Sequence, residues 1–287
     1  MPKLRFRIAS IAIFACAALP VWHAVFASLP SGHLSFHSLD IGQGDATFIE
    51  TPRHHQILID GGPDQSVLSE LGAVMPFYDK TIDLIVLTHP QEDHMFGLIP
   101  VLERYHVGAV LMTGVNYQTS TYAEFKKVIA EKNIPLYRAH AGQNIRFNDG
   151  VALDILYPFD NLEGKDFAGD VNDTSVASRI TFGGKKFLVM GDAGMLEETN
   201  LVNSEEDLDI DVLKVSHHGS RTSTSRLFLE NTTPSVAVIS VGARNRYGHP
   251  TKETLDRLDG ISVYRTDKNG RVEITTDGIE LKTVSER

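Results

Sequence analysis

The sequence predicts an α/β fold in which helices cover a partly parallel sheet. Short apolar segments alternate with segments of helical spacing from residue 34 onward, and Gly, Pro and Asp residues separate them. Such alternation is typical of parallel strands that are joined by helices. No change in composition divides the chain after residue 31. We therefore expect one domain over residues 31–287, preceded by a separate N-terminal segment over residues 1–30.

The first half of the domain contains the clearest alternation of strands and helices. Residues 83–87 are apolar except for Asp83, which is typical of a strand buried on both faces. Helical spacing of apolar residues predicts helices over 67–74, 98–105 and 122–131. The expected strands are 34–39, 46–50, 56–59, 83–87, 109–112 and 134–137.

The second half repeats this pattern. The expected strands are 151–156, 176–182, 186–190, 212–215 and 236–241, and the expected helices are 196–201 and 252–258. Residues 160–173 are polar and rich in Gly and Asp, which predicts a long loop of the kind that often carries function. The last strands, 262–265, 272–275 and 279–282, are expected to form a small antiparallel meander with a hairpin turn at Asp277-Gly278.

The N-terminal segment has the layout of a membrane signal. Lys3, Arg5 and Arg7 precede 22 residues, 8–29, that contain no Asp, Glu, Lys or Arg. As a helix this run would extend ~33 Å, enough for a hydrocarbon core of ~30 Å. The basic end should stay in the cytoplasm, so we expect a single-pass membrane protein with its domain outside. Small residues before Ser28 also fit a cleaved signal peptide, which would make the protein secreted.

Charge and cysteine content exclude two classes of protein. The chain has 27 Lys+Arg against 37 Asp+Glu, a net charge of −10, which excludes a protein that coats nucleic acid by charge alone. The single cysteine, Cys16, excludes an intrachain disulfide and a zinc site built from cysteines. A metal site in this chain must therefore use His, Asp or amide side chains.

Histidines and aspartates follow the expected strands at four places. The four segments are THPQEDH at 88–94, Gly191-Asp192, His217-His218, and Asn245 to His249. Each segment alone is compatible with a helix cap, a turn or a solvent-exposed pair. Because the carboxyl ends of neighbouring parallel strands open into one crevice, all four together indicate a shared site. Imidazole and carboxylate ligands suit Zn, Mn or Fe.

The order of these segments resembles the metallo-β-lactamase superfamily and, within it, the ComEC-like branch. The matching segments span residues 34–276: LDIGQGDA at 39–46, ILIDGG at 57–62, the 88–94 loop, NDTS at 172–175, GD at 191–192, KVSHHGS at 214–220 and YGHP at 247–250. The resemblance implies an αββα sandwich with a metal site at one edge of the two sheets.

The resemblance also implies a role for each candidate residue. His89 would bind a first metal ion, Asp93 and His94 a second, and Asp192 would bridge the two. His217 would complete the second site, with His218 as the alternative if the loop is turned. Asp60 would not bind a metal ion itself but would orient the ligand imidazoles of the metal loop. The expected catalytic residues are Asp93, Asn245 and His249 near the phosphate, and Lys214 as a source of positive charge.

Two positions depart from the superfamily pattern. Gln91 stands where the pattern His-x-His-x-Asp-His has its second histidine, and it would be a weaker, neutral ligand. No histidine lies between His140 and His217, where a third motif would supply one; Asn172 and Asp173 occupy that region. Oxygen-rich ligation would favour Mn²⁺ over Zn²⁺ at the first site. The chain is therefore expected to bind one or two divalent metal ions.

The resemblance implies a metal-dependent phosphodiesterase or nuclease that acts outside the cytoplasmic membrane. DNA and competence-type uptake proteins would be its partners, and the membrane would be contacted through the N-terminal helix. Two alternatives stay open at this point. One is a cell-envelope phosphoester esterase, and the other is a non-catalytic scaffold with a degenerate metal site.

Overall fold

The computed structural model describes residues 29–287 apart from Glu205, together with five isolated positions at 7, 14, 16, 18 and 22. The expected N-terminal membrane helix therefore lies almost entirely outside the described residues. Among the residues that are described, none belongs to a helix that is long and apolar enough to span a bilayer.

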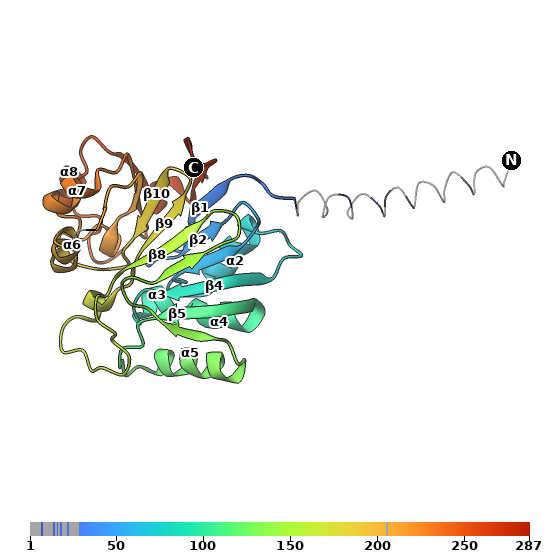
Figure 1. The fold of residues 1–287 in the computed structure, drawn as a ribbon, viewed down its shortest axis with the longest axis horizontal. Coiled ribbons are helices and arrows are strands. Elements are labelled where there is room, and N and C mark those ends of the chain that lie inside the picture. The colour runs from blue at the N-terminus through green and yellow to red at the C-terminus, as the bar shows by residue number, and fades with distance from the viewer. Residues whose placement is uncertain are drawn as a thin grey trace.

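Two sheets form the centre of the described domain (Figure 1). The 8-stranded sheet has the order β15-β14-β1-β2-β3-β4-β5-β6. Its strands are β1 (Leu34–Ser38), β2 (Thr47–Glu50), β3 (Gln56–Ile59), β4 (Thr81–Leu87), β5 (His106–Met112), β6 (Leu136–Arg138), β14 (Val272–Thr276) and β15 (Leu281–Ser285). The 7-stranded sheet has the order β13-β12-β11-β10-β9-β8-β7. Its strands are β7 (Asn144–Arg146), β8 (Ala152–Tyr157), β9 (Ala177–Phe182), β10 (Lys185–Val189), β11 (Val212–Lys214), β12 (Val236–Ile239) and β13 (Ser262–Arg265).

Helices cover the outer face of each sheet (Figure 1). The helices beside the 8-stranded sheet are α2 (Ser66–Val74), α3 (Glu92–Met95), α4 (Leu98–Arg104) and α5 (Ser120–Glu131). Those beside the 7-stranded sheet are α6 (Met195–Val202), α7 (Arg226–Thr232) and α8 (Lys252–Arg257). Shorter elements are the 3₁₀ turns η1 (Val171–Thr174) and η2 (Ser216–Gly219) and the single-turn helix α9 (Thr266–Asn269).

Three apolar clusters hold these layers together. One packs α2, α4 and α5 on the 8-stranded sheet, a second lies between the sheets, and a third packs α6 and α7 on the 7-stranded sheet. Alternate residues of β4 serve two clusters, because Ile85 faces the helices and Val86 faces the other sheet. Between the sheets, the rings of Phe36 and Phe187 stack with centroids 5.3 Å apart. The expected αββα sandwich is therefore confirmed.

The C-terminal part differs from the expected meander. β13 pairs in parallel with β12 and belongs to the 7-stranded sheet, whereas β14 pairs antiparallel with β1 and β15 in the other sheet. The segment between β13 and β14 crosses from one sheet to the other, which local patterning does not show. The hairpin at Asp277-Gly278 is present, and β15 begins later than expected, at Leu281.

Candidate metal centre

Strand ends from both sheets meet at one edge of the sandwich. Asp60 directly follows β3 and His89 comes shortly after β4, and these two strands are parallel neighbours. Asp192 and His218 come shortly after β10 and β11, which are parallel neighbours in the other sheet. Because parallel strands carry their carboxyl ends to one edge, the sequence places these side chains together.

His94 lies on α3 and is fully buried. Its Nδ1 lies 2.8 Å from Oδ2 of Asp60, whose other oxygen accepts a hydrogen bond from the backbone N–H of Thr88. The backbone N–H of Gly61 donates to the carbonyl of His94 at 2.7 Å, which joins α3 to the end of β3. Asp60 therefore lies behind His94 as expected and holds its ring with Nε2 directed into the site.

His89 is oriented by two hydroxyl groups. Its Nδ1 lies 3.1 Å from Oγ1 of Thr88 and 3.3 Å from Oγ of Ser175. The Thr88 hydroxyl donates its proton to Oδ2 of Asp60 at 2.7 Å, so it can only accept from His89. The proton of His89 is therefore on Nδ1, and Nε2 carries a free lone pair. Lone-pair imidazole nitrogen is the form that binds metal ions.

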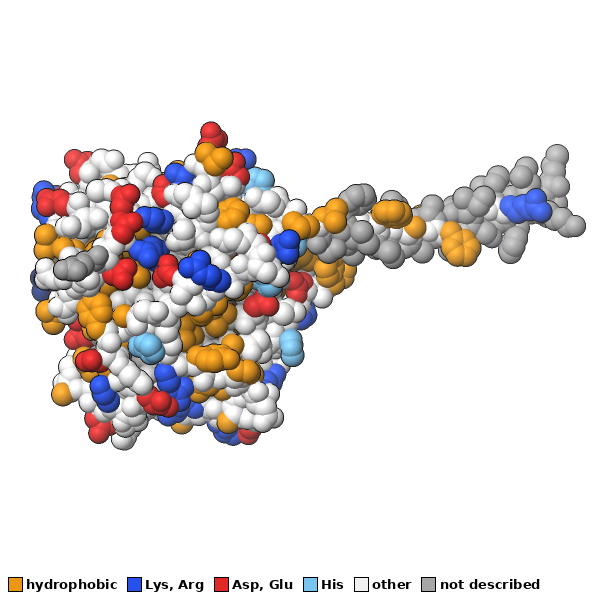
Figure 2. All heavy atoms as spheres, viewed as in Figure 1, with side chains coloured by type: hydrophobic (Ala, Val, Ile, Leu, Met, Phe, Trp, Pro, Cys, Tyr) orange, Lys and Arg blue, Asp and Glu red, His pale blue; other side chains and the backbone are white. Residues whose placement is uncertain are grey.

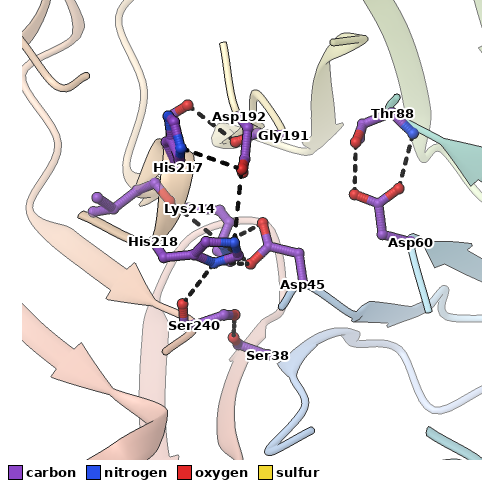
Figure 3. A network of polar contacts seen from close by, with 12 residues as sticks. Ser38, Asp45, Asp60, Thr88, Gly191, Asp192, Lys214, His217, His218 and Ser240 are labelled. Carbon is purple, nitrogen blue, oxygen red and sulfur yellow. Dashed lines mark hydrogen bonds and ion pairs between the residues drawn. The ribbon is translucent and has the colours of Figure 1, made fainter. Parts of the chain in front are cut away.

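His218 is held in the same way from the other sheet (Figure 3). Its Nδ1 donates to the carbonyl oxygen of Ser240 at 3.0 Å and lies 3.3 Å from Oδ1 of Asp45. Its Nε2 lies 3.5 Å from Oδ2 of Asp93 and 3.7 Å from Oδ2 of Asp192. All three buried histidines thus use Nδ1 for support and turn Nε2 inward.

Asp192 lies where the three rings converge. Its Oδ1 is 3.2 Å from Nε2 of His94, and its Oδ2 faces His218. Among the described residues, four buried atoms of this cluster have no hydrogen-bond partner: Nε2 of His89, His94 and His218, and Oδ1 of Asp192. Unpartnered buried polar atoms are costly in a folded protein, so a group that binds all four atoms is expected here.

Among the described residues the donor atoms form four overlapping sets, three of which include His94, and two of these three use the residues that were expected as ligands. One set is His89, His94 and Asp192, and the other is Asp93, His94 and His218; within each set the ligand atoms lie within 4.8 Å of one another. Imidazole nitrogens with carboxylate oxygens are the donor set of Zn²⁺, Mn²⁺ and Fe sites. The two oxygens of Asp192 face different imidazoles, which suits a carboxylate shared by two ions.

Burial and charge perturb the titration of this cluster. Burial lowers the pKa of His89 to about 3, and the neighbouring His94 acts in the same direction. Burial also disfavours the charged form of His218, but the carboxylates of Asp192 and Asp45 outweigh it and raise the pKa to about 10. Burial would raise the pKa of Asp192, yet His94 and His218 hold it well below its usual value. Asp192 therefore stays ionised, as a carboxylate ligand of a metal ion must be.

Lys214 lies elsewhere than expected. It is only 1% exposed, and its Nζ donates to both carboxylate oxygens of Asp45 at 2.7 Å. Its charge is therefore neutralised inside the protein and does not face a substrate. Asp45, to which sequence reasoning assigned no role, joins Lys214 to His218. The signal was present in the sequence as the aspartate of the LDIGQGDA segment, but only the fold brings residues 45 and 214 together.

The turned loop brings His218, the alternative, into the cluster in place of His217. Both residues have positive φ, 52° and 53°, so the chain reverses at this point. His217 stays at the rim of the site, 26% exposed, with Nε2 3.8 Å from Oδ2 of Asp192. Among the described residues, neither ring nitrogen of His217 has a hydrogen-bond partner like the Ser240 carbonyl that supports His218.

Asn245 supports the loop that carries His249. Its amide nitrogen donates to the carbonyls of Gly242 and His249, and its Oδ1 accepts from the backbone N–H groups of Tyr247 and His249. The amide that was expected to donate to phosphate is thus engaged within the loop. The ring of His249 lies 5.9 Å from that of His217, at the open side of the cluster.

The remaining candidates lie at the edge of the site. Gln91 is half-buried and is the N-cap of α3, the helix that carries Asp93 and His94. Asn172 and Asp173 lie in η1, directly before Ser175, which contacts His89. Oδ1 of Asn172 is buried without a hydrogen-bond partner among the described residues. An oxygen ligand from η1 in place of the missing histidine therefore stays a prediction.

The comparison with known families agrees with this geometry. A family model described as the metallo-beta-lactamase superfamily matches residues 39–243, which include His89, His94, Asp192 and His218 but not Asn245 or His249. The chain belongs to the metallo-beta-lactamase superfamily. Its fold implies divalent metal ions, and the His/Asp cluster supplies candidate sites for them.

The curated relatives of this superfamily member are competence proteins, which confirms the resemblance to the ComEC-like branch. ComE operon protein 3 of Bacillus subtilis is 31% identical over 255 residues, which are 82% of this chain and 32% of that protein. Competence protein ComA of Neisseria gonorrhoeae is 29% identical over 253 residues, 86% of this chain and 33% of that protein. The chain thus spans about a third of the length of the curated relatives it matches.

Solved structures share the fold at low sequence identity. Igni18, a metallo hydrolase from the archaeon Ignicoccus hospitalis, is 15% identical with a TM-score of 0.52 over 88% of this chain and 100% of that chain. CmlA, a diiron beta-hydroxylase from Streptomyces venezuelae, is 15% identical with a TM-score of 0.53 over 88% and 54%. Because one fold carries a hydrolase and a hydroxylase, the reaction must be argued from the site.

Proposed function

We propose that this protein is a metal-dependent phosphodiesterase that acts on nucleic acid. The observation that carries the proposal is the convergence of three buried Nε2 atoms on the carboxylate of Asp192. Divalent ions bound there would neutralise charge on a phosphate and lower the pKa of a water nucleophile. The competence-protein relatives support a DNA-related substrate. Mn²⁺ and Zn²⁺ both fit the nitrogen and oxygen donors.

Different residues of the chain would bind the metal ions, orient the water and assist the leaving group. His89, His94, His218 and Asp192 would hold the metal ions, and their Nδ1 partners keep the rings from turning. Asp93 is less buried than these ligands, and its Oδ2 lies 3.5 Å from Nε2 of His218, so it would bind the second ion or orient a nucleophilic water. The half-buried ring of His249, next to that of His217, would donate a hydrogen bond to the leaving oxygen.

Hydrolysis of a defined substrate tests the proposal. The full chain is incubated with a single-stranded DNA oligonucleotide and, in parallel, with a choline-phosphate ester, in Mn²⁺, in Zn²⁺ and in EDTA. We expect metal-dependent cleavage of the oligonucleotide. Asp192→Asn should reduce it by at least about a hundredfold, because ion-based charge stabilisation contributes several kcal/mol. Asp160→Asn, in an exposed loop, is the matched control.

Three outcomes would contradict the proposal in different ways. Cleavage of the choline ester alone would favour an envelope esterase. A metal-free protein that cleaves neither substrate would favour a scaffold. Undiminished cleavage by Asp192→Asn would place the chemistry elsewhere in the chain.

We also propose that the domain acts outside the cytoplasmic membrane, attached through residues 1–30. The basic residues before the apolar run of the sequence support this orientation. Protease added to intact spheroplasts should digest residues 31–287, while protection of the domain until lysis would contradict this location.

A further inference from the structure

A series of rings leads from the candidate metal centre to the protein surface. The ring centroids of His218 and His217 are 6.4 Å apart, those of His217 and His249 are 5.9 Å apart, and those of His249 and Tyr247 are also 5.9 Å apart. The first ring of the series is buried, and the last, Tyr247, is 53% exposed. A partly exposed aromatic ring therefore lies a few ring spacings from the place where a phosphate would react.

The turn that carries Tyr247 is stabilised by Asn245. Oδ1 of Asn245 accepts hydrogen bonds from the backbone N–H groups on both sides of Gly248, at 3.1 Å from Tyr247 and 3.0 Å from His249. The two rings lie nearly parallel, with an angle of 16° between their planes. A rigid, exposed aromatic side chain presents contact area at a small cost in conformational entropy.

The same turn carries positive charge in an acidic protein. Arg244 and Arg246 are both exposed, whereas the whole chain has a net charge of −10. The guanidinium carbon of Arg246 lies 5.3 Å from the centre of the Tyr247 ring, and its terminal nitrogen donates to the tyrosine hydroxyl at 3.2 Å. The side chain of Arg246 thus lies over the tyrosine ring, from which it would turn to reach a phosphate when a base stacks there.

We propose that the turn formed by residues 244–247 is a nucleotide-binding subsite. Tyr247 stacks on an unpaired nucleobase next to the scissile phosphodiester, and Arg246 contacts the adjoining phosphate. A π-face beside a cation is the combination that binds single-stranded nucleic acid, because every base can stack on it. A duplex keeps its bases stacked on one another, so the subsite selects single strands. This inference rests on the proposed nucleic-acid substrate.

Binding of a base-free strand tests the stacking directly. Fluorescence anisotropy measures binding of the full chain in EDTA to labelled single-stranded oligothymidylate and to the same oligomer with abasic residues. We expect wild type to prefer the base-containing strand by on the order of tenfold, the size of one stacking contact. Tyr247→Leu should remove this preference, and Tyr247→Phe should retain it. Tyr137→Leu, which removes another exposed tyrosine, on β6, is the control.

Salt dependence tests the phosphate contact. Arg246→Gln should reduce the slope of log affinity against log salt concentration by about 0.7, the value for one phosphate on a single strand. Arg104→Gln, an exposed arginine on α4, should leave the slope unchanged. If Arg246→Gln leaves the slope unchanged, Arg246 does not contact a phosphate of the bound strand.

Other results would overturn the subsite. Tyr247→Leu that keeps the preference, or that weakens both strands equally, would mean that the ring has only a structural role. Equal binding of a duplex would contradict the selection of single strands. Binding that depends on Tyr247 without any cleavage would contradict the proposed function but support the subsite. Cleavage together with binding that does not depend on Tyr247 would support the proposed function and contradict the subsite.

Discussion

Each buried histidine of the candidate centre depends on a partner at Nδ1. Asp60 supports His94, the Thr88 hydroxyl supports His89, and the Ser240 carbonyl supports His218. These contacts fix both the tautomer and the ring orientation, which the ligand residues cannot do alone. The geometry of the centre therefore depends on the three rings and on the three groups that contact their Nδ1 atoms.

The buried pair of Lys214 and Asp45 gives a prediction about stability. Lys214→Met leaves the Asp45 carboxylate buried without its cation, and we expect the free energy of unfolding to fall by about 3–5 kcal/mol. In Asp45→Leu/Lys214→Met neither charge of this pair remains, so most of the loss should be recovered. Urea unfolding in EDTA measures both variants, and additive losses in the double variant would show that the pair is not coupled.

Sequence reasoning identified the residue types of the site better than their roles. His89, Asp93, His94 and Asp192 were expected as ligands, and the structure gathers all four. The choice between His217 and His218 depended on the turn of one loop, which no spacing rule fixes. Lys214 was expected to supply positive charge at the site. Its partner, Asp45, is remote in sequence and becomes adjacent only when the two sheets pack, so the sequence does not show the ion pair.

At the scale of elements, the turn η2 decides which histidine enters the centre. It carries two consecutive histidines with positive φ, a conformation that is strained for residues other than glycine. Gly219 follows with φ of 80°, and a Cβ there would lie 2.5 Å from Cβ of Pro250. The turn is thus packed against the segment that carries His249.

Gly219→Ala tests this packing. The added methyl group must displace either Pro250 or η2, and movement of η2 shifts His218, so we expect Mn²⁺ affinity to fall by on the order of tenfold or more. Gly142→Ala is the matched control, since Gly142 has φ of 87° but no atom within 4 Å of the position that an added methyl group would occupy. Calorimetric titration measures the two affinities. Equal affinities would mean that η2 tolerates the displacement.

The elements themselves were largely predictable. Residues 67–74, 98–105 and 122–131 correspond to α2, α4 and α5 within a few residues, because their apolar spacing is long and regular. β7 and α7 were not expected; they are short, with three and seven residues, and give no long periodic pattern. The placement of β13 in a different sheet from β14 depends on long-range pairing that local patterns do not encode.

For the whole molecule, the acidic charge restricts how a polyanion can bind. On the face drawn in Figure 2, acidic and basic side chains are interspersed rather than gathered into a basic patch. If the proposed function holds, attraction for phosphate would come from local features, namely cations bound at the centre and the arginines of the 244–247 turn. This differs from proteins that bind nucleic acid through a broad electrostatic field.

His37 gives a prediction for the pH dependence of global stability. Burial, with a smaller effect from Arg271, lowers the pKa of His37 to about 4, below its ordinary value of 6.5. Between these values the unfolded chain binds the proton and the folded chain does not, so stability falls as pH decreases from about 6.5 to about 4. His37→Leu should reduce that slope by about 1.4 kcal/mol per pH unit in urea unfolding with EDTA.

The exposed His106 provides a control for the same experiment. His106→Leu should keep the slope of the wild-type protein. If His37→Leu also keeps it, the acid sensitivity of the fold originates at other groups.

The central claim is that the cluster around Asp192 is a metal centre completed by His218. Metal content of the purified full chain, measured by mass spectrometry after equilibration with Mn²⁺ or Zn²⁺, tests it most directly. We expect wild type and His217→Ala to retain bound metal and His218→Ala to lose at least one ion. Retention of full metal content by His218→Ala, or a metal-free wild-type protein, would contradict the account.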